Sequence, residues 1–159
     1  MQKIAQFFKV SKDEFVKSGN PAVYQDIILP KRATVGSAGY DFFAPEEFSL
    51  LPNQTVKIAT GVRVKIDAGW VLKIYPRSSL GFKYRLNLDN TVGIIDSDYY
   101  YADNEGHIFI KMTNCGNTPL TVEKGKAFAQ GIFLEYGITV DDECDGVRTG
   151  GLGSTDKKL

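Results

Sequence analysis

The sequence has 159 residues and is poor in several features that mark common classes of protein. It has only two cysteines, Cys115 and Cys144, which lack metal-ligand spacing and cannot form a disulfide framework. No apolar run reaches the ~20 residues of a membrane span, and the first residues lack a signal-type apolar stretch. We therefore expect no membrane partner and an intracellular protein, cytoplasmic or also nuclear if the source is eukaryotic.

An excess of either charge is also missing. Lysine and arginine total 19, and aspartate and glutamate total 19, so the formal net charge is zero at pH 7. Because nucleic acids attract proteins through clustered positive charge, we expect no nucleic acid as a partner. Any phosphate group must be bound by a few local residues. The length fits one domain, since a single core commonly serves ~100–200 residues.

The sequence also lacks the motifs of zinc hydrolases and serine hydrolases, which are H-E-x-x-H, C-x-x-C and G-x-S-x-G. His107 is the only histidine, and no serine or cysteine nucleophile pattern surrounds it. We therefore expect His107 to have a structural role.

The segments that are present are typical of β-structure. Short stretches of β-branched and aromatic residues alternate with turn residues, among them many of the 16 glycines. Val62, Val64 and Ile66 fall on one side of an extended chain, as in a strand covered on one face. We predict an all-β fold, which is a sandwich, a jelly roll or a small barrel. The expected strands are residues 4–10, 23–29, 55–66, 70–75, 108–113 and 127–135.

Helix is expected mainly near the N-terminus. Residues 11–14 (SKDE) form a capping-box pattern, which predicts a helix of about two turns that stops near Gly19. After residue 140 the composition becomes acidic and then glycine-rich. We therefore expect a domain of residues 1–140 and a mobile C-terminal arm of residues 141–159, either a frayed terminus or a lid over a ligand.

Five polar, glycine-containing islands interrupt the apolar segments. Loops on a rigid β scaffold are where binding sites tend to lie, so each island is a candidate. The islands are residues 36–41, 76–81, 90–99, 125–130 and 148–155.

Two islands carry groups suited to phosphate binding and to water activation. Arg77, Ser78 and Ser79 follow a predicted strand and suit a phosphate at the N-terminus of a short helix. The alternative is a strand-end turn whose arginine makes a structural ion pair. Asp96 offers a base, and the amide of Asn90 offers a donor and an acceptor that can read a base edge. The alternative for this island is a set of solvated loop residues.

The other three islands also have two explanations each. Asp41 follows a glycine turn, and turn chemistry alone accounts for that pattern. Gln130 lies among small and apolar residues and must be hydrogen-bonded, either to backbone or to a ligand. Arg148 precedes glycine amides and hydroxyls that suit a triphosphate, although their spacing is not that of a Walker P-loop.

In this order, the islands resemble the five motifs of the homotrimeric dUTPase family, over residues 25–156. The resemblance implies a distorted β-barrel of jelly-roll type, assembled as a homotrimer with its sites at subunit boundaries. It also implies an Mg²⁺-dependent enzyme that hydrolyses dUTP to dUMP and diphosphate. That reaction limits uracil incorporation into DNA and supplies dUMP for dTMP synthesis.

The resemblance also gives roles to residues on the phosphate side of the site. Asp96 would orient and deprotonate the water that attacks the α-phosphorus, and Asp41 would hold a water bound to Mg²⁺. The residues that would contact phosphates are Arg77, Ser78, Ser79 and Gln130. The arm residues that would close over the substrate are Arg148, Leu152, Gly153 and Ser154.

On the base side, an amide and nearby backbone groups would read the edge of uracil, where cytosine presents the wrong polarity. The residues that would do so are Asn90, Ile94, Ile95 and Phe109. Tyr99 would pack against the deoxyribose and leave no room for a 2′-hydroxyl. Residues 100–105 depart from the Tyr-Arg-Gly that commonly continues this motif in the family, and they lengthen the hairpin.

Other functions fit part of the pattern. A dCTP deaminase shares the barrel and the phosphate-binding islands, but it normally has a glutamate after the second motif, and residues 80–88 contain no carboxylate. A non-catalytic regulatory protein of this fold would not need the candidate catalytic residues, all of which are present. A jelly-roll lectin or capsid protein does not explain five ordered islands.

Leu152 stands where the family usually has a phenylalanine that stacks on uracil. Because aromatic stacking adds roughly 0.5–1.5 kcal/mol beyond area burial, we expect the arm to close less firmly than in a phenylalanine-bearing relative. Hydrogen exchange of the arm with nucleotide present measures this difference. Equal protection of the arm in the two proteins would contradict the expectation.

Overall fold

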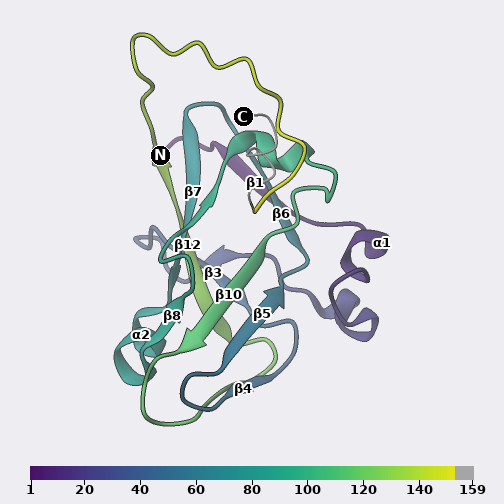
Figure 1. Cartoon of the computed structure of the whole chain (residues 1–159), viewed down its shortest axis with the longest axis vertical. Coiled ribbons are helices and arrows are strands. Elements are labelled where there is room, and N and C mark those ends of the chain that lie inside the picture. Colours follow the sequence, from purple (N-terminus) through teal and green to yellow (C-terminus); the bar gives the residue numbers. More distant parts are fainter. Residues whose placement is uncertain (153–159) are drawn as a thin grey trace.

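Antiparallel strands dominate the structure, a computed structural model in which residues 1–152 are described (Figure 1). The largest sheet has the order β2 (Lys31–Arg32), β3 (Tyr40–Phe43), β12 (Ala127–Glu135), β7 (Trp70–Pro76), β9 (Gly93–Ile95). A three-stranded sheet has the order β5 (Thr55–Ala59), β10 (Phe109–Asn114), β8 (Leu86–Leu88). Two further pairs are β1 (Ala5–Lys9) with β6 (Val62–Ile66), and β4 (Phe48–Leu50) with β11 (Leu120–Val122).

The hydrophobic core lies between these sheets. Leu72 on β7 and Ile110 on β10 are buried in the same cluster, one from each of the two larger sheets. The ring of Phe7 on β1 packs against the rings of Tyr40 and Phe133, which connects the β1–β6 pair to the largest sheet. Burying each such aliphatic or aromatic side chain stabilises the fold by about 1.5–3 kcal/mol. The prediction of an all-β domain with one core is confirmed.

Strand β6 shows the predicted alternation. Its three apolar side chains, Val62, Val64 and Ile66, are buried, while Arg63 and Lys65 between them are more exposed. The expected strand over residues 55–66 is nevertheless interrupted. The chain turns at Gly61, which has a positive φ of 70°. β5 and β6 therefore belong to different sheets, and an added Cβ at Gly61 would lie 2.3 Å from a side-chain carbon of Ile27.

The prediction of a strand over residues 23–29 is wrong. The segment begins instead with the 3-10 helix η1 (Pro21–Asp26). The side chain of Asn20 caps this helix by accepting a hydrogen bond from the N–H of Ala22 at 3.0 Å, and proline is favoured in the first turn. These two local signals outweigh the β-branched composition that suggested a strand.

The helix near the N-terminus is confirmed, but it is shorter than expected. α1 spans Lys12–Phe15, and the hydroxyl of Ser11 accepts a hydrogen bond from the N–H of Glu14 at 3.1 Å. Glu14 does not complete the capping box, because its carboxylate pairs with Lys17 at 2.6 Å. A second short helix, α2 (Ser78–Tyr84), begins directly after Arg77.

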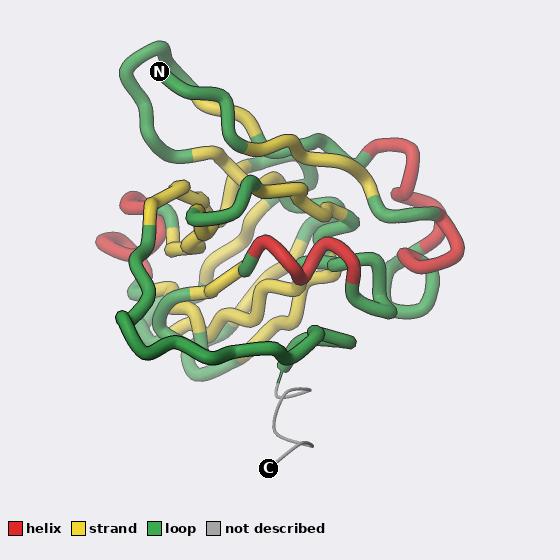
Figure 2. Tube along the Cα trace, turned by 90° about the horizontal axis from the view of Figure 1, so that it is seen from above, coloured by secondary structure: helices red, strands yellow, loops and turns green. Residues whose placement is uncertain are grey.

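The chain after β12 leaves the sheets in a wide loop and returns beside η2 (Ser97–Tyr101) (Figures 1 and 2). There the N–H of Asp103 donates to the carbonyl of Thr149 at 3.0 Å. Between residue 136 and Leu152, within the described part, the chain forms no helix or strand. A domain boundary at residue 140 stays a prediction. None of the helices in residues 1–152 is long and apolar enough to cross a membrane.

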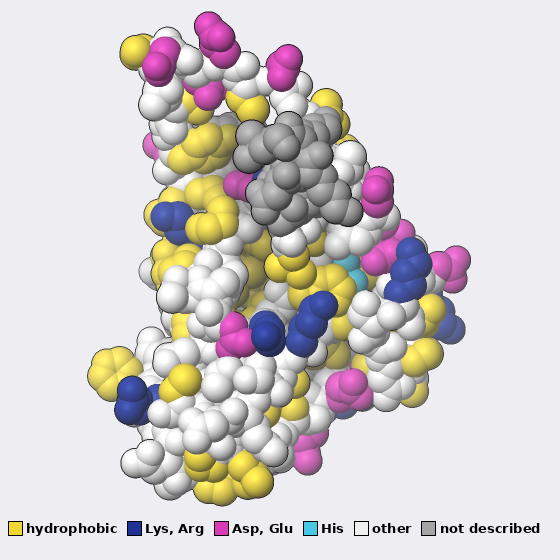
Figure 3. Space-filling view, in the orientation of Figure 1, with side chains coloured by type: hydrophobic (Ala, Val, Ile, Leu, Met, Phe, Trp, Pro, Cys, Tyr) yellow, Lys and Arg dark blue, Asp and Glu magenta, His cyan; other side chains and the backbone are white. Residues whose placement is uncertain are grey.

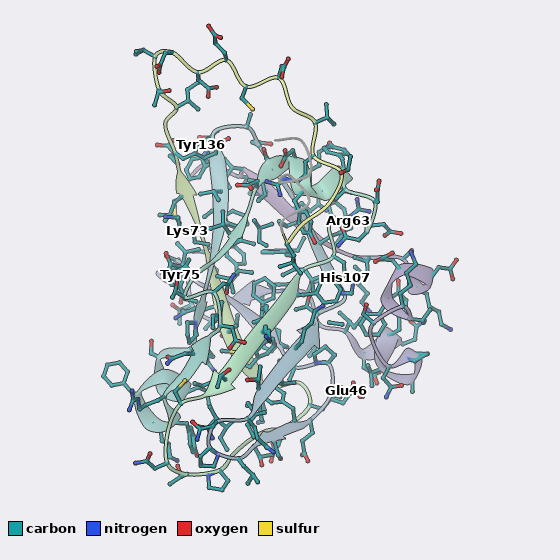
Figure 4. All side chains as sticks on the ribbon, in the orientation of Figure 1. Glu46, Arg63, Lys73, Tyr75, His107 and Tyr136 are labelled. Carbon is teal, nitrogen blue, oxygen red and sulfur yellow. The ribbon has the colours of Figure 1, made fainter. Side chains whose placement is uncertain are left out.

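His107, labelled in Figure 4, is fully buried. It holds the turn at Gly61. Its Nε2 accepts a hydrogen bond from the N–H of Gly61 at 2.9 Å, so the proton of the neutral ring is on Nδ1. The rings of Phe15 and Phe109 pack on it. Burial lowers the pKa of His107 to about 4. These contacts support the structural role expected for the only histidine.

We expect the free energy of unfolding to fall as the pH is lowered from about 6.5 to about 4. In that window the unfolded chain binds a proton at His107 that the folded chain does not, which costs about 2–3 kcal/mol between pH 7 and pH 4.5. Urea denaturation at both pH values measures the loss. His107→Gln keeps an acceptor for Gly61 but does not titrate, so an equally steep pH dependence in this variant would contradict the assignment.

Candidate active site

A cavity of about 430 Å³ opens between β9, β10, η2 and the returning C-terminal segment. Figure 3 shows this hollow with hydrophobic side chains in its floor and charged side chains at its rim. The structure thus brings together the residues predicted for the base side, the candidate catalytic aspartate and part of the arm. These residues are Asn90, Ile94, Ile95, Asp96, Tyr99, Phe109, Arg148 and Leu152.

Strand pairing places Asp96 at the cavity. β9 is held on the edge of β7, with Ile94 opposite Lys73 and Ile95 opposite Leu72. Asp96 follows immediately in an extended conformation and precedes η2, so its carboxylate leaves the sheet where the pairing ends. The carboxylate is therefore anchored by a rigid strand yet still accessible, as a group that must meet water and substrate needs to be.

Arg148 joins the arm to two carboxylates that follow β9. Its Nη2 donates to Oδ2 of Asp96 at 2.5 Å, and its Nε donates to Oδ1 of Asp98 at 2.8 Å. Hydrogen bonds between charged groups are stronger than neutral ones, so one guanidinium holds both side chains in place. Gly151 follows closely against the ring of Tyr99, where an added Cβ would lie 2.9 Å from a ring carbon.

Tyr99 forms one wall of the cavity and is only 9% exposed. Its hydroxyl donates to the carbonyl of His107 at 2.8 Å, and it accepts from the side-chain amide of Asn104 at 2.8 Å. Burial raises the pKa of Tyr99, so the phenol is neutral at physiological pH. The aromatic ring is therefore fixed on the side where the sugar of a bound nucleotide is expected.

The predicted phosphate side forms a separate group on the largest sheet. Gln130 on β12 lies between Asp41 on β3 and Tyr75 on β7. Nε2 of Gln130 donates to the carbonyl of Pro76 at 3.2 Å, and Nε of Arg77 lies 3.3 Å from Oδ1 of Asp41. Gln130 and Arg77 thus have the structural partners that the sequence left open, while Arg77 stays partly exposed.

Ser78 and Ser79 open helix α2 directly beside this group, as predicted for a phosphate at the N-terminus of a short helix. Gly39 allows the close approach of Gln130, because a Cβ there would lie 2.8 Å from Oε1 of the glutamine. This group therefore concentrates a guanidinium, hydroxyls and free backbone N–H groups on one end of β7.

The two groups do not meet within one chain. In residues 1–152, none of the phosphate-side residues lines the cavity. The reason is the order of strands, since β12 lies on one edge of β7 and β9 on the other. Gly153 and Ser154 lie outside the described residues. Leu152 reaches the cavity rim but is 89% exposed, so its side chain stacks on nothing in this arrangement.

Sequence reasoning missed three charged residues at the cavity. Lys57 and Lys111 are opposite each other on β5 and β10, and Nζ of Lys57 lies 4.6 Å from the ring centre of Phe109. Asp89 accepts from the hydroxyl of Thr113, and that bond, together with Lys111 at 3.2 Å, holds the pKa of Asp89 below its usual value. The sequence held a signal for the two lysines, because each is a polar position of a predicted strand, in residues 55–66 and 108–113, and these two strands pair in the sheet.

The donors present suit a magnesium ion that arrives with a nucleotide. Among residues 1–152, no three His, Cys, Asp or Glu side chains come together as a protein-only metal cage. Mg²⁺ does not need such a cage, since it usually keeps several waters and binds through one or two carboxylates and substrate phosphates. Asp41 beside Arg77 and Gln130 offers one such carboxylate.

A small antiparallel β-domain with a cavity of this size, lined by an amide, an aromatic ring, carboxylates and an arginine, belongs to the class of β-proteins that offer a site for a small polar ligand. The family model described as dUTPase matches residues 25–155. The chain belongs to the dUTPase family.

Individual relatives agree with this assignment. The chain is 45% identical over 132 residues to a deoxyuridine 5′-triphosphate nucleotidohydrolase of Lactococcus lactis, covering 81% of this chain and 88% of that one. A crystal structure of dUTPase from Streptococcus mutans superposes with a TM-score of 0.67 at 34% identity, over 84% of this chain and 97% of the other. The predicted family and the jelly-roll-like β fold are confirmed.

A more distant structure shares the fold alone. The dUTPase of phage phi11 of S. aureus, in a mutant form described as coordinating a structural Mg(II) ion, has a TM-score of 0.67 at 19% identity. The match covers 91% of this chain and 98% of the phage protein.

Asp98→Asn removes one of the two carboxylates that hold Arg148 and leaves Asp96 in place. We expect amide hydrogen exchange in residues 146–152 to accelerate by about threefold to tenfold without nucleotide, since a half-exposed charged hydrogen bond is worth on the order of 1 kcal/mol. Asp142→Asn is the control, because this exposed carboxylate forms none of the ion pairs found in residues 1–152. Unchanged exchange in Asp98→Asn would show that the ion pair does not hold the arm.

Proposed function

We propose that this chain hydrolyses dUTP to dUMP and diphosphate as an Mg²⁺-dependent homotrimer, which limits uracil incorporation into DNA and supplies dUMP for dTMP synthesis. The observation that carries the proposal is the cavity at which Asn90, Asp96 and Arg148 meet. This reaction requires a group that recognises the base, a carboxylate that activates water and a cation that binds phosphate, and these three residues supply them in that order.

Base selection rests on Asn90 and on the backbone of the two strands that line the cavity, near Ile94 and Phe109. An amide and peptide groups can match the donors and acceptors of uracil. Cytosine would leave a donor facing a donor, which costs roughly 1–3 kcal/mol for the unsatisfied group. Tyr99 forms the sugar-facing wall, where its fixed ring leaves no room for a 2′-hydroxyl.

Hydrolysis rests on Asp96. Its carboxylate orients a water and takes one proton from it as the water oxygen forms a bond to the α-phosphorus. The bond from the α-phosphorus to the bridging oxygen of the β-phosphate breaks, and diphosphate leaves. Arg148, which pairs with Asp96 in the absence of substrate, is placed to turn its guanidinium to the phosphates when they enter.

Mg²⁺ would be held by the substrate phosphates and, through a water, by Asp41. When bound, the ion neutralises phosphate charge and fixes the conformation of the triphosphate. Arg77, Ser78, Ser79 and Gln130 then bind the remaining phosphate oxygens. The serines supply hydroxyls and N–H groups at the start of α2, and the arginine supplies a partly exposed guanidinium.

The homotrimer accounts for the two separated groups. A closed ring of three chains repeats one contact between unlike surfaces, so the phosphate side of one chain can face the cavity of the next. The largest sheet supports such a contact, since the exposed Ile94 lies opposite Lys73, which Figure 4 labels, and Leu134 on β12 is exposed as well. We also propose a cytoplasmic location, where a reducing environment suits the free thiols of Cys115 and Cys144.

Diphosphate release from dUTP, dCTP, dTTP and UTP, each with Mg²⁺ or EDTA, tests the function. We expect activity only with dUTP, and only when Mg²⁺ is present. For Asp96→Asn we expect kcat to fall by about 10²–10⁴-fold, because the amide cannot accept the proton. Asp67→Asn, in the turn between β6 and β7, is the matched control. Equal cleavage of all four nucleotides would overturn the specificity, and ammonia release from dCTP would indicate a deaminase instead.

A further inference from the structure

The residues after Tyr99, which lengthen this segment relative to the family motif, form a hydrogen-bond circuit with that side chain. The Tyr99 hydroxyl donates to the carbonyl of His107, and the amide of Asn104 donates to the hydroxyl, both at 2.8 Å. Oδ1 of Asn104 accepts from the N–H of Gly106 at 3.2 Å. The Tyr99 hydroxyl thus makes both of these hydrogen bonds with residues that do not line the cavity.

The circuit permits only one orientation of the Asn104 amide. Because Oδ1 faces the N–H of Gly106, the NH₂ group must face Tyr99, and the single proton of the phenol must go to His107. Gly106 has a positive φ of 71°, and a Cβ there would lie 2.6 Å from the carbonyl oxygen of Tyr99. Glycine is therefore needed for the insertion to return so close to the tyrosine.

The insertion is also fastened independently of Asn104. The carboxylate of Glu105 accepts two hydrogen bonds from Ser11, at 2.8 Å from the N–H and 2.6 Å from the hydroxyl. The guanidinium of Arg63 stacks 3.7 Å from the ring centre of Tyr100 and donates to its carbonyl at 2.6 Å. Changing Asn104 should therefore leave the insertion in place and affect chiefly the phenol that it holds.

We propose that Asn104 is a positioning residue for sugar selectivity. Its amide restrains the ring of Tyr99 at the cavity wall, and this restraint makes the ring reject a 2′-hydroxyl. The proposal rests on the proposed function, and it assigns to the insertion a role in the choice of deoxyribonucleotide over ribonucleotide. Without the amide, the ring can yield to the extra oxygen of UTP, while dUTP needs no such movement.

The test compares kcat/KM for dUTP and for UTP, with Mg²⁺, in the wild type and in Asn104→Ala. We expect the dUTP-to-UTP ratio to fall about tenfold, equivalent to about 1.4 kcal/mol, through a gain in UTP cleavage. The kcat for dUTP should stay within about threefold of the wild type. Tyr101→Ser, at an exposed position of the same insertion, should keep the wild-type ratio.

Two further variants separate positioning from a merely structural role. Asn104→Leu keeps the volume of the side chain but can neither donate to Tyr99 nor accept from it, so it should lower the ratio as Asn104→Ala does, and it carries the test if the alanine variant is unstable. In a Tyr99→Phe background, Asn104→Ala should change the ratio no further, because the hydroxyl is gone.

An unchanged ratio in Asn104→Ala and Asn104→Leu would overturn the inference. Equal losses of kcat/KM for dUTP and UTP would also overturn it. So would a further fall in the dUTP-to-UTP ratio when Asn104→Ala is added to Tyr99→Phe. A wild type that does not cleave dUTP would overturn the proposed function itself, and that result is obtained before any variant is measured.

Discussion

Strand β7 carries hydrogen-bond partners on both edges, β12 on one and β9 on the other, and this pairing decides where the functional side chains lie. On the β12 edge, Gln130 meets Asp41 and the turn that holds Arg77. On the β9 edge, pairing stops at Ile95 and releases Asp96 into the cavity. Because β7 lies between β12 and β9, the two groups of candidate residues lie on opposite edges of this strand, and the proposed function joins them through a second chain.

The chain has no net charge that would attract a phosphate, so local charges at the cavity must serve instead. The guanidinium of Arg148 donates to two carboxylates, one of which, that of Asp96, is the group proposed to activate water. A triphosphate brings its own negative charge and competes for the same arginine. In the proposed function, binding of the substrate phosphates to Arg148 would release Asp96, so that one side chain would couple the two events.

Much of the fold could be predicted from sequence because the signals are local. The alternation of Val62, Val64 and Ile66 marked a half-buried strand, and Ser11 marked the start of a helix. The strand expected over residues 23–29 failed because the cap at Asn20 is stronger than β-propensity, and the break at Gly61 depends on its contact with Ile27, which no local pattern reports.

The candidate site residues stay a prediction, but their arrangement could not be predicted at all. Ordered motifs pointed to Asp96, Arg77 and Gln130 one by one, yet their division between the two edges of β7 is a property of strand order. The circuit through Asn104 could not be predicted either, because it joins an insertion to a backbone carbonyl and depends on the turn at Gly106.

The most direct test of a site completed by a second chain is complementation between two inactive variants. Arg77→Ala and Asp96→Asn chains would be unfolded together in equal amounts, refolded, and assayed for dUTP hydrolysis beside each variant refolded alone. If each site takes its phosphate side from one chain and its cavity from another, random assembly restores about a quarter of the wild-type activity. A mixture no more active than the separate variants would contradict the account and place the whole site within one chain.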